Sequence, residues 1–429
     1  MKKHILLTGC LLVALQAAAQ SNYGVQFSSL LSDNLTLENA IRLGLENNSD
    51  FLSAKEEIKI AEQKVSEAKF RYLPQFALQG TATWYEADSP MVLPEPGINR
   101  FLPDTNSLDS KHFYGVGVTA TQYLYSGGRI NSTLKIARAN LKQIQSRYET
   151  VKNTVVLDIK KSFVNLLYAQ ENVNFTQTLY EQVKNWRYAA DPWMRIRQKA
   201  IVAQLKSAHQ QAQSQLVRAR LAMLVSLNKE LNSPLTISGH LDPVSVSGDL
   251  PHFQLWATEF RPELKSAIYA LELDNIAIDL ALSRRYPDIL LNASYERVGD
   301  SDLNDENKQV SLAVRLPLPY TFSHQVSQKK AEQKKSTLRR AAIEDKIHVQ
   351  VASSFEQMRF WQQEATDRQE TYQELTSLLN RAAKNAAPND LSSLEARREY
   401  LQAGQAYLEA LRENHIAKAQ LEWAIGKDL

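Results

Sequence analysis

The residue types that carry out catalysis are present in this chain, but their spacing does not support it. The eight histidines are scattered, and no two of them have the spacing of metal ligands on one helix. Cys10 is the only cysteine, which excludes a four-cysteine metal site and a disulfide within the chain. No glycine-rich phosphate-binding loop occurs. The sequence therefore predicts a protein that is not an enzyme and that uses no metal or cofactor.

Charged residues do gather at two predicted turns, where they could act on ions. Asp191, Arg195 and Arg197 surround the first turn, and Asp390 ends the second. Carboxylates repeated by symmetry around a pore mouth would favour cations and resist anions. The two arginines could instead form salt bridges that hold such a mouth closed. The plainer alternative is that all four are ordinary turn and cap residues, because Asp favours turns.

Gly127, Gly128 and Arg129 stand where a predicted strand gives way directly to a predicted helix. Glycine permits the unusual backbone angles and the close packing that such a corner demands. We expect Arg129 to interact with a neighbouring group there. The second half of the chain has no glycine pair at the matching place, residues 320–325, so its corner must be built differently.

Very long helices are the elements that must position these residues. Apolar residues between Leu134 and Val155 recur every three and four positions, which indicates a coiled-coil seam. The spacing predicts long helices over about 130–186 and 323–384, with return helices over about 193–228 and 391–425. The first long helix would measure roughly 85 Å, far more than a globular core requires.

Four segments break the helical period and alternate between apolar and polar residues. They cover about 75–85, 113–124, 288–298 and 308–318. Each segment has about 10 residues, which is the length that a tilted barrel strand needs to cross a bilayer. Aromatic residues lie near the ends of these segments, as in the interface belts of membrane proteins. The alternative, a half-exposed soluble sheet packed on helices, fits poorly with helices too long to fold back over it. The long connection 86–111 would then lie outside the cell.

Four strands are too few to close a barrel. An open sheet edge is not tolerated in lipid, because its backbone groups would lack partners. We therefore expect other copies of the chain, related by cyclic symmetry, to complete the ring.

The first 20 residues have the pattern of a secretory signal peptide. A basic start precedes an apolar run over 5–15 and small residues at 17–19, so we exclude 1–20 from the fold. Residues 7–10 also resemble a lipoprotein cleavage box. Cleavage there would leave an apolar N-terminus, so lipidation of Cys10 is the less favoured alternative.

Composition argues against a helical membrane protein and against a nucleic-acid-binding protein. After the signal peptide, no stretch approaches the ~20 apolar residues of a transmembrane helix. The mean hydropathy is −0.38. The formal net charge of +3 gives no indication of nucleic-acid binding.

The chain also repeats itself. When Pro74 is aligned with Pro287, the surrounding residues match at that spacing without a gap, and each half runs helix, two strands, long helix and return helix. We predict a first repeat over 21–231, a linker over 232–260 and a second repeat over 261–429.

Four places resemble the outer membrane efflux protein (TolC) family. They are residues 35–41, which resemble its opening; 123–129, ending in Ser126-Gly127-Gly128-Arg129, which resemble its strand-to-helix signature; 261–264, Arg-Pro-Glu-Leu, which resemble the start of its second repeat; and 394–397 with 421–426, which resemble its ending. Each motif is short, but their order along the repeat makes the resemblance specific.

The resemblance implies a mainly α fold with membrane β structure: a homotrimer whose transmembrane β-barrel continues into a periplasmic α-helical coiled-coil barrel. It implies an outer-membrane location extending into the periplasm of a Gram-negative bacterium. The function would be a passive exit duct of a tripartite efflux or type I secretion system, surrounded by outer-membrane lipid.

The same resemblance implies two protein partners. Cargo, whether drugs, metal ions or protein, would be driven by an inner-membrane pump of the proton-driven or ATP-driven type through a periplasmic adaptor protein. The turns at Asp191 and Asp390 would form the periplasmic aperture and dock the adaptor. The alternative is that the chain is itself a periplasmic coiled-coil adaptor or structural protein, which should show one helical hairpin rather than a duplicated unit.

Overall fold

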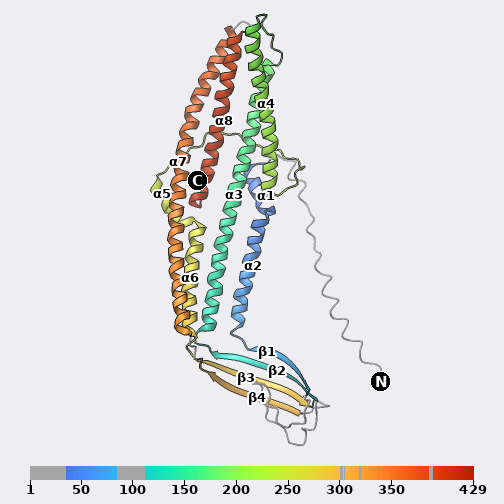
Figure 1. The fold of residues 1–429 in the computed structure, drawn as a ribbon, viewed down its shortest axis with the longest axis vertical. Helices are drawn as coiled ribbons and strands as arrows, with labels where there is room; N and C mark the ends of the chain where they lie inside the picture. The colour runs from blue at the N-terminus through green and yellow to red at the C-terminus, as the bar shows by residue number, and fades with distance from the viewer. Residues whose placement is uncertain (1–34, 85–111, 300–302, 304, 318–320, 386–389) are drawn as a thin grey trace, which may run out of the picture. The chain divides into compact units, whose positions relative to one another are not determined.

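The computed structural model describes residues 35–84, 112–299, 303, 305–317, 321–385 and 390–429. The predicted signal peptide, Cys10, the connection 86–111 and most of the turn before Asp390 lie outside these residues. The described part is mostly helical with one four-stranded sheet (Figure 1). No helix within it is long and apolar enough to pass through a membrane.

The elements follow the predicted order of helices and strands. The helices are α1 (Leu37–Asn47), α2 (Ser49–Phe70), α3 (Arg129–Val183), α4 (Pro192–Ser226), α5 (Leu250–Phe260), α6 (Pro262–Ser283), α7 (Phe322–Asn385) and α8 (Leu391–Ile425). The strands are β1 (Gln75–Trp84), β2 (His112–Tyr125), β3 (Asp288–Gly299) and β4 (Asp305–Arg315). The two long helices, α3 and α7, have 55 and 64 residues. The expected mainly α fold class with a small β part is confirmed.

The repeat extends further than the sequence indicated. The spacing that takes Pro74 to Pro287 also takes α1 onto α5, α2 onto α6 and the start of β1 onto the start of β3. Residues 250–260, predicted as linker, are therefore a helix and the counterpart of α1. Pro251 stands in the first turn of α5, where a proline is tolerated because that amide has no helical partner.

The remaining linker residues, 232–249, contain no helix and only an isolated bridge from Ile237 to Leu35. Side chains satisfy their backbone groups instead. The amide of Leu241 donates to the Glu171 carboxylate over 3.0 Å, and the amide of Val244 donates to the Asn414 side chain over 2.8 Å. These bonds hold the irregular segment against α3 and α8.

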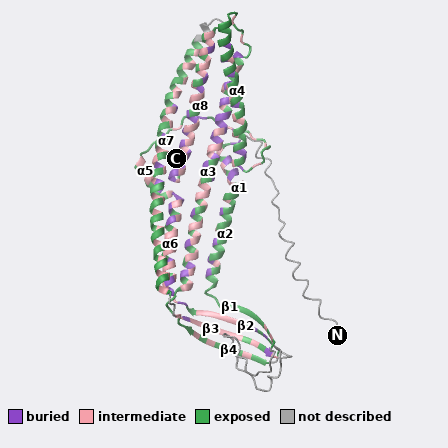
Figure 2. Cartoon of the chain, viewed as in Figure 1, coloured by how far each residue is buried: buried purple, intermediate pink, exposed green. Residues whose placement is uncertain are grey.

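The chain divides into two compact units that cut across both repeats. Unit 1 comprises residues 1–48, 156–245 and 359–419, and unit 2 comprises 49–155, 246–358 and 420–429. Each unit therefore draws on both halves of the sequence. Figure 2 shows buried and partly buried residues along the helices, while much of the sheet is exposed.

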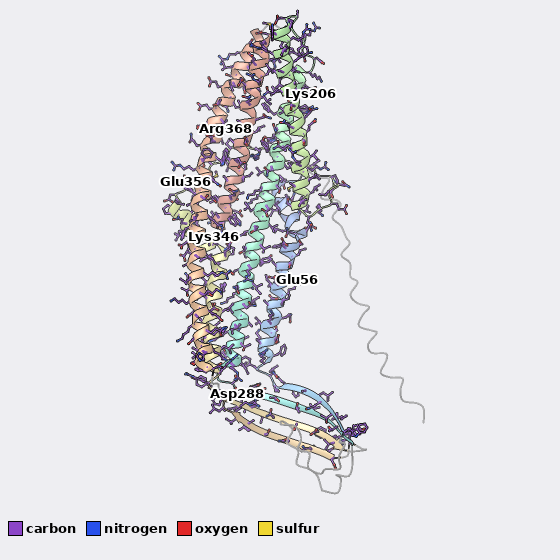
Figure 3. All side chains as sticks on the ribbon, in the orientation of Figure 1. Glu56, Lys206, Asp288, Lys346, Glu356 and Arg368 are labelled. Carbon is purple, nitrogen blue, oxygen red and sulfur yellow. The ribbon has the colours of Figure 1, made fainter. Side chains whose placement is uncertain are left out.

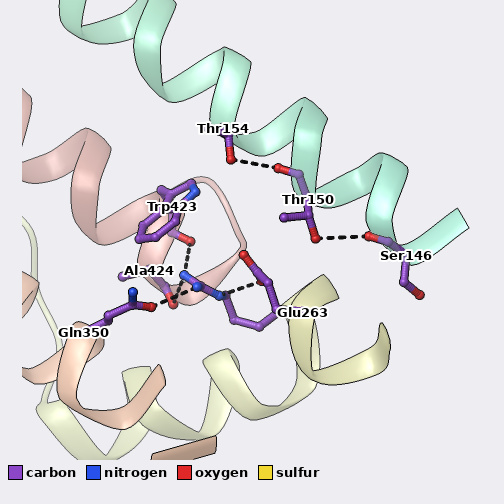
Figure 4. A network of polar contacts seen from close by, with 8 residues as sticks. Ser146, Thr150, Thr154, Glu263, Gln350, Trp423 and Ala424 are labelled. Carbon is purple, nitrogen blue, oxygen red and sulfur yellow. Dashed lines mark hydrogen bonds and ion pairs between the residues drawn. The ribbon is translucent and has the colours of Figure 1, made fainter. Parts of the chain in front are cut away.

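The junction between α5 and α6 holds a buried charge in unit 2. Arg261 is 3 % exposed and donates to the carbonyls of Trp423 and Ala424 at the end of α8, over 3.0 and 3.2 Å. It also donates to Gln350 over 2.9 Å and forms an ion pair with Glu263 at 2.9 Å (Figure 4). The guanidinium thus bonds carbonyls of the last helical turn, of which that of Trp423 also accepts from the Gly426 amide over 3.2 Å.

Candidate functional site

The sheet in unit 2 has one apolar face and one polar face. All three strand pairs are antiparallel, in the order β1-β2-β3-β4, and directly paired residues share a face. The apolar face carries Phe76, Leu78, Trp84, Tyr114, Val116, Val118, Ile289, Leu291, Val310, Leu312 and Val314. The polar face carries Gln75, Gln79, Thr81, Thr83, Thr119, Thr121, Asn292, Ser294, Gln309 and Ser311.

The apolar face is uncovered within the chain. Phe76, Leu78 and Val310 are 75, 80 and 76 % exposed. Such a large contiguous apolar surface marks a contact with lipid or protein. β1 and β4 each have a strand partner on one side only among the described residues, so two rows of backbone groups are also left open.

The corner between β2 and α3 depends on the glycine pair. Gly127 and Gly128 have φ angles of 58° and 86°, a region that other residues enter at a cost. A Cβ on Gly127 would lie 2.6 Å from the Cβ of Tyr286 and 2.8 Å from the carbonyl oxygen of Ser283. A Cβ on Gly128 would meet nothing within 4 Å. Backbone angle restricts both positions, and close packing restricts only the first.

The neighbour that Arg129 contacts is Asp288. Arg129 Nη2 lies 2.6 Å from Asp288 Oδ1, and the carboxylate side chain is 10 % exposed. Asp288 is the first residue of β3 and lies where the sheet meets the helices (Figure 3). The ion pair therefore ties the start of α3 to the start of β3. Sequence reasoning did not single out Asp288, although its place directly after the repeated Pro287 was a usable signal.

The turn between α3 and α4 lies in unit 1 and uses its polar residues for local bonds. Asp191 is the N-cap of α4, where its carboxylate accepts from the amide of Met194 over 2.8 Å. Arg195 donates to the carbonyl of Ala189 over 2.9 Å. Gln198, which is 1 % exposed, accepts from the Ala189 amide over 2.8 Å and was not predicted from the sequence.

Arg197 and Asp390 remain more open to other groups. Arg197 is exposed and forms no ion pair with any residue that the structure describes. Asp390 hydrogen-bonds the hydroxyl of Ser392 and accepts from its amide over 3.4 Å. The bond from the Ser392 hydroxyl lowers the pKa of the Asp390 carboxyl. Both residues are solvent-facing within the chain.

The helix pair α3 and α4 meets α8, the return helix of the pair α7 and α8, in one apolar cluster of unit 1. The cluster consists of Leu179, Val183, Ile201, Leu205, Leu394 and Leu401. Arg397 in α8 donates to Gln182 in α3 over 3.2 Å and stands 5.9 Å over the Trp186 ring. The structure therefore brings the end of α3 and the first turns of α4 and α8 together in unit 1.

Metal chemistry finds no support in the described residues. No group of three or more His, Cys, Asp or Glu side chains among them is arranged to hold an ion. The polar groups named above form caps, corner ties and turns. None of these named groups pairs a nucleophile with an activating base.

Comparisons with known proteins agree with this geometry. Residues 40–229 match the sequence profile of the outer membrane efflux protein family. None of the curated proteins matches the chain. The fold resembles the open state of the Neisseria gonorrhoeae MtrE outer membrane channel, with a TM-score of 0.74 and 18 % identity over 94 % of each chain.

Two other solved outer membrane proteins have a similar fold. The Campylobacter jejuni CmeC outer membrane channel matches with a TM-score of 0.73 and 14 % identity, over 91 % of this chain and 85 % of that one. The Vibrio cholerae outer membrane protein VceC matches with a TM-score of 0.72 and 14 % identity, over 91 % of this chain and 96 % of that one. Residues 40–229 thus resemble the outer membrane efflux protein family in sequence, and nearly the whole chain shares the fold of these solved outer membrane proteins.

Proposed function

We propose that this protein is an outer membrane efflux protein that acts as a homotrimer and forms the exit duct of a tripartite efflux or type I secretion system. The observation that carries the proposal is the sheet of unit 2, which has an uncovered apolar face and two open edges. Its strands have 10, 14, 12 and 11 residues, enough to cross a bilayer when tilted. The apolar face contacts lipid, and the polar face lines the passage.

Neighbouring copies close the sheet. β1 and β3 run in one direction and β2 and β4 in the other, so β4 of one copy beside β1 of the next continues the antiparallel order. Every backbone group in the membrane then has a partner, as lipid requires. Three copies related by a threefold axis give a closed ring with an even number of strands.

A hollow at the start of β1 supports this closure. It has a volume of about 1090 Å³ and lies between the end of α2, the start of β1 and the start of α3. Phe70, Leu73 and Phe76 line it and are more than half exposed. Because antiparallel pairing brings the end of a neighbouring β4 to the start of β1, the next chain covers this hollow.

The helical hairpins serve the other partners. The turns at Asp191 and Asp390 form the periplasmic mouth, where a periplasmic adaptor connects the duct to an inner-membrane pump. Asp390 supplies the cation preference of this mouth. Of the two arginines, Arg197 is the better candidate for a salt bridge between copies, because Arg195 is already bonded to turn carbonyls.

Disulfide trapping tests the ring. In a Cys10→Ser background the chain has no cysteine, so Gln79→Cys in β1 can be combined in turn with Gln309→Cys, Ser311→Cys or Ala313→Cys in β4. Oxidation of outer membranes should give covalent species up to three chains for at least one pair. The control pairs Gln79→Cys with Ser294→Cys in the inner strand β3 and should give none between chains. A soluble chain that never crosslinks would refute the proposed function.

A further inference from the structure

A cluster of charges interrupts the apolar face of the sheet at one end. Arg297 Nη2 lies 2.6 Å from Glu306 Oε1, and Lys308 Nζ lies 3.3 Å from Glu306 Oε2. The hydroxyl of Tyr295 donates to Glu306 over 3.1 Å, and Arg297 Nε donates to the same hydroxyl over 3.1 Å. Arg297 pairs with Glu306 across the strands, and Tyr295 with Lys308, which places all four on the apolar face.

The cluster lies at the end of the sheet farther from the helices. β3 begins at Asp288, directly after α6, and reaches Arg297 near its far end. With the helices in the periplasm, this end faces the outer leaflet of the membrane. Trp84 and Tyr114 lie at the same end of the apolar face, where interfacial aromatic residues of membrane barrels are found.

The charges of the cluster do not balance. Among the residues that the structure describes at this end, two cations share the Glu306 carboxylate, and the side chains of Arg297 and Lys308 are 52 and 71 % exposed. A net positive charge facing lipid needs an anion, and basic residues at the membrane surface attract anionic headgroups. We propose, building on the proposed function, that Tyr295, Arg297 and Lys308 bind the phosphate of a phosphorylated glycolipid headgroup in the outer leaflet.

An apolar hollow beside the cations fits the rest of such a lipid. It has a volume of about 500 Å³ and is lined by Gly80, Ala82, Tyr114 and Val116. Val116 pairs with Gly80 on one side and with Arg297 on the other, so the hollow and the cluster share a row of the sheet. A Cβ on Gly80 would meet nothing within 4 Å, which leaves room for an acyl chain. The cations thus bind the phosphate of the lipid, and the neighbouring hollow takes its acyl chain.

Glu306 competes with the lipid phosphate for Arg297 and Lys308. Removing a cation and removing Glu306 should therefore change glycolipid binding in opposite directions. Arg297→Gln and Lys308→Gln should each weaken glycolipid binding about fivefold, since each cation near a membrane surface contributes about one such factor. Glu306→Gln should strengthen binding, because it frees both cations. Arg315→Gln is the matched control, since Arg315 lies on the polar face of β4 and its loss should change nothing.

The experiment uses the assembled protein in nanodiscs of phosphatidylethanolamine doped with a bisphosphorylated glycolipid, and native mass spectrometry counts bound glycolipid. Preferential retention that follows the predicted signs would support the site. Equal retention in all variants, weaker binding in Glu306→Gln, or full competition by inorganic phosphate would overturn it. Oligomer size is measured in the same spectra. A chain that forms no oligomer in membranes refutes the proposed function, whereas an intact oligomer without glycolipid preference refutes only this site.

Discussion

The two copies of the repeat have the same backbone at the junction of their first two helices but use different chemistry there. Asn48 ends α1 with φ −69° and ψ 122°, and Arg261 ends α5 with φ −63° and ψ 119°. In the first copy, the side chain of Asn228 donates to the Asn47 carbonyl over 2.9 Å. In the second copy, the Arg261 guanidinium bonds the end of α8. Duplication has thus preserved geometry while one copy came to depend on a buried charge.

The largest expected effect is at that buried charge. Arg261→Met leaves Glu263 without its ion-pair partner and removes the bonds that two carbonyls of α8 accept from the guanidinium, so it should cost about 3–5 kcal/mol of stability, as for other broken buried pairs. Asn48→Ala at the matching position should cost less than about 1 kcal/mol. The melting temperature of the purified oligomer, followed by circular dichroism, measures both. Adding Glu263→Leu to Arg261→Met should recover part of the loss; equal losses at Asn48 and Arg261 would contradict the comparison.

The second largest expected contrast in stability is between the two strand-to-helix corners, β2 to α3 and β4 to α7. Gly127→Ala combines a left-handed backbone with contacts below 3 Å to Tyr286 and to the Ser283 carbonyl, so we expect a loss of about 2–3 kcal/mol. Gly128→Ala has only the backbone cost of about 1 kcal/mol. At the second corner, Thr321→Ala removes only an exposed hydrogen bond that the Thr321 hydroxyl accepts from Gln325 over 3.1 Å, so a loss below about 1 kcal/mol is expected. Heat resistance of the oligomer on gels ranks the three variants, and a Gly128 variant worse than the Gly127 variant would refute the packing argument.

The ends of the return helices provide a smaller contrast. Asn228 and Gly426 both have positive φ, 50° and 75°. A Cβ on Gly426 would lie 3.1 Å from backbone atoms of Phe260, so Gly426→Asn should cost about 1–2 kcal/mol. Asn228→Gly keeps the backbone angle and loses one hydrogen bond, so a change of about 1 kcal/mol or less is expected. Chemical denaturation of both variants measures the two losses of stability. A larger loss for Asn228→Gly than for Gly426→Asn would contradict the expected order.

The smallest expected effect concerns ion preference at the two turns. Asp390→Asn should reduce cation preference in a planar bilayer, while Asp191→Asn should change it less, because Asp191 already caps α4. The lowered pKa of Asp390 keeps its carboxylate charged below the usual range of Asp, so its share of the preference should persist in mild acid and vanish only as the pH falls through that lowered pKa. Reversal potentials measured from neutral to acidic pH test this. Unchanged selectivity in both variants would end the gate hypothesis.

Sequence periodicity was sufficient to predict most of the elements. Alternation in β3 and β4 placed Leu291 and Leu312 on one face and Asn292 and Ser311 on the other, as the register shows. That pattern is local, because successive side chains of any strand point to opposite faces. The corner at Gly127 and Gly128 could also be predicted from the sequence, because glycine is the residue that most readily adopts a positive φ angle.

Single buried charges could not be predicted in this way. Arg261 was noted only as part of a motif, and its partners at the end of α8 are more than 160 positions away along the chain. Asp288 likewise depends on Arg129 from another element. The helix α5 was missed for a different reason: Pro251 was interpreted as a linker residue, whereas it occupies a first turn. Tertiary partners, rather than local propensity, decide these positions.

The open edges of β1 and β4 also have a genetic consequence. In the proposed ring each chain supplies only part of a shared wall, so a chain with a damaged β4 would leave a gap in every ring that it joins, even when the other members are sound. Such alleles should therefore be dominant over a wild-type copy in the same cell. Alleles that prevent folding altogether should be recessive, because their products never reach the ring.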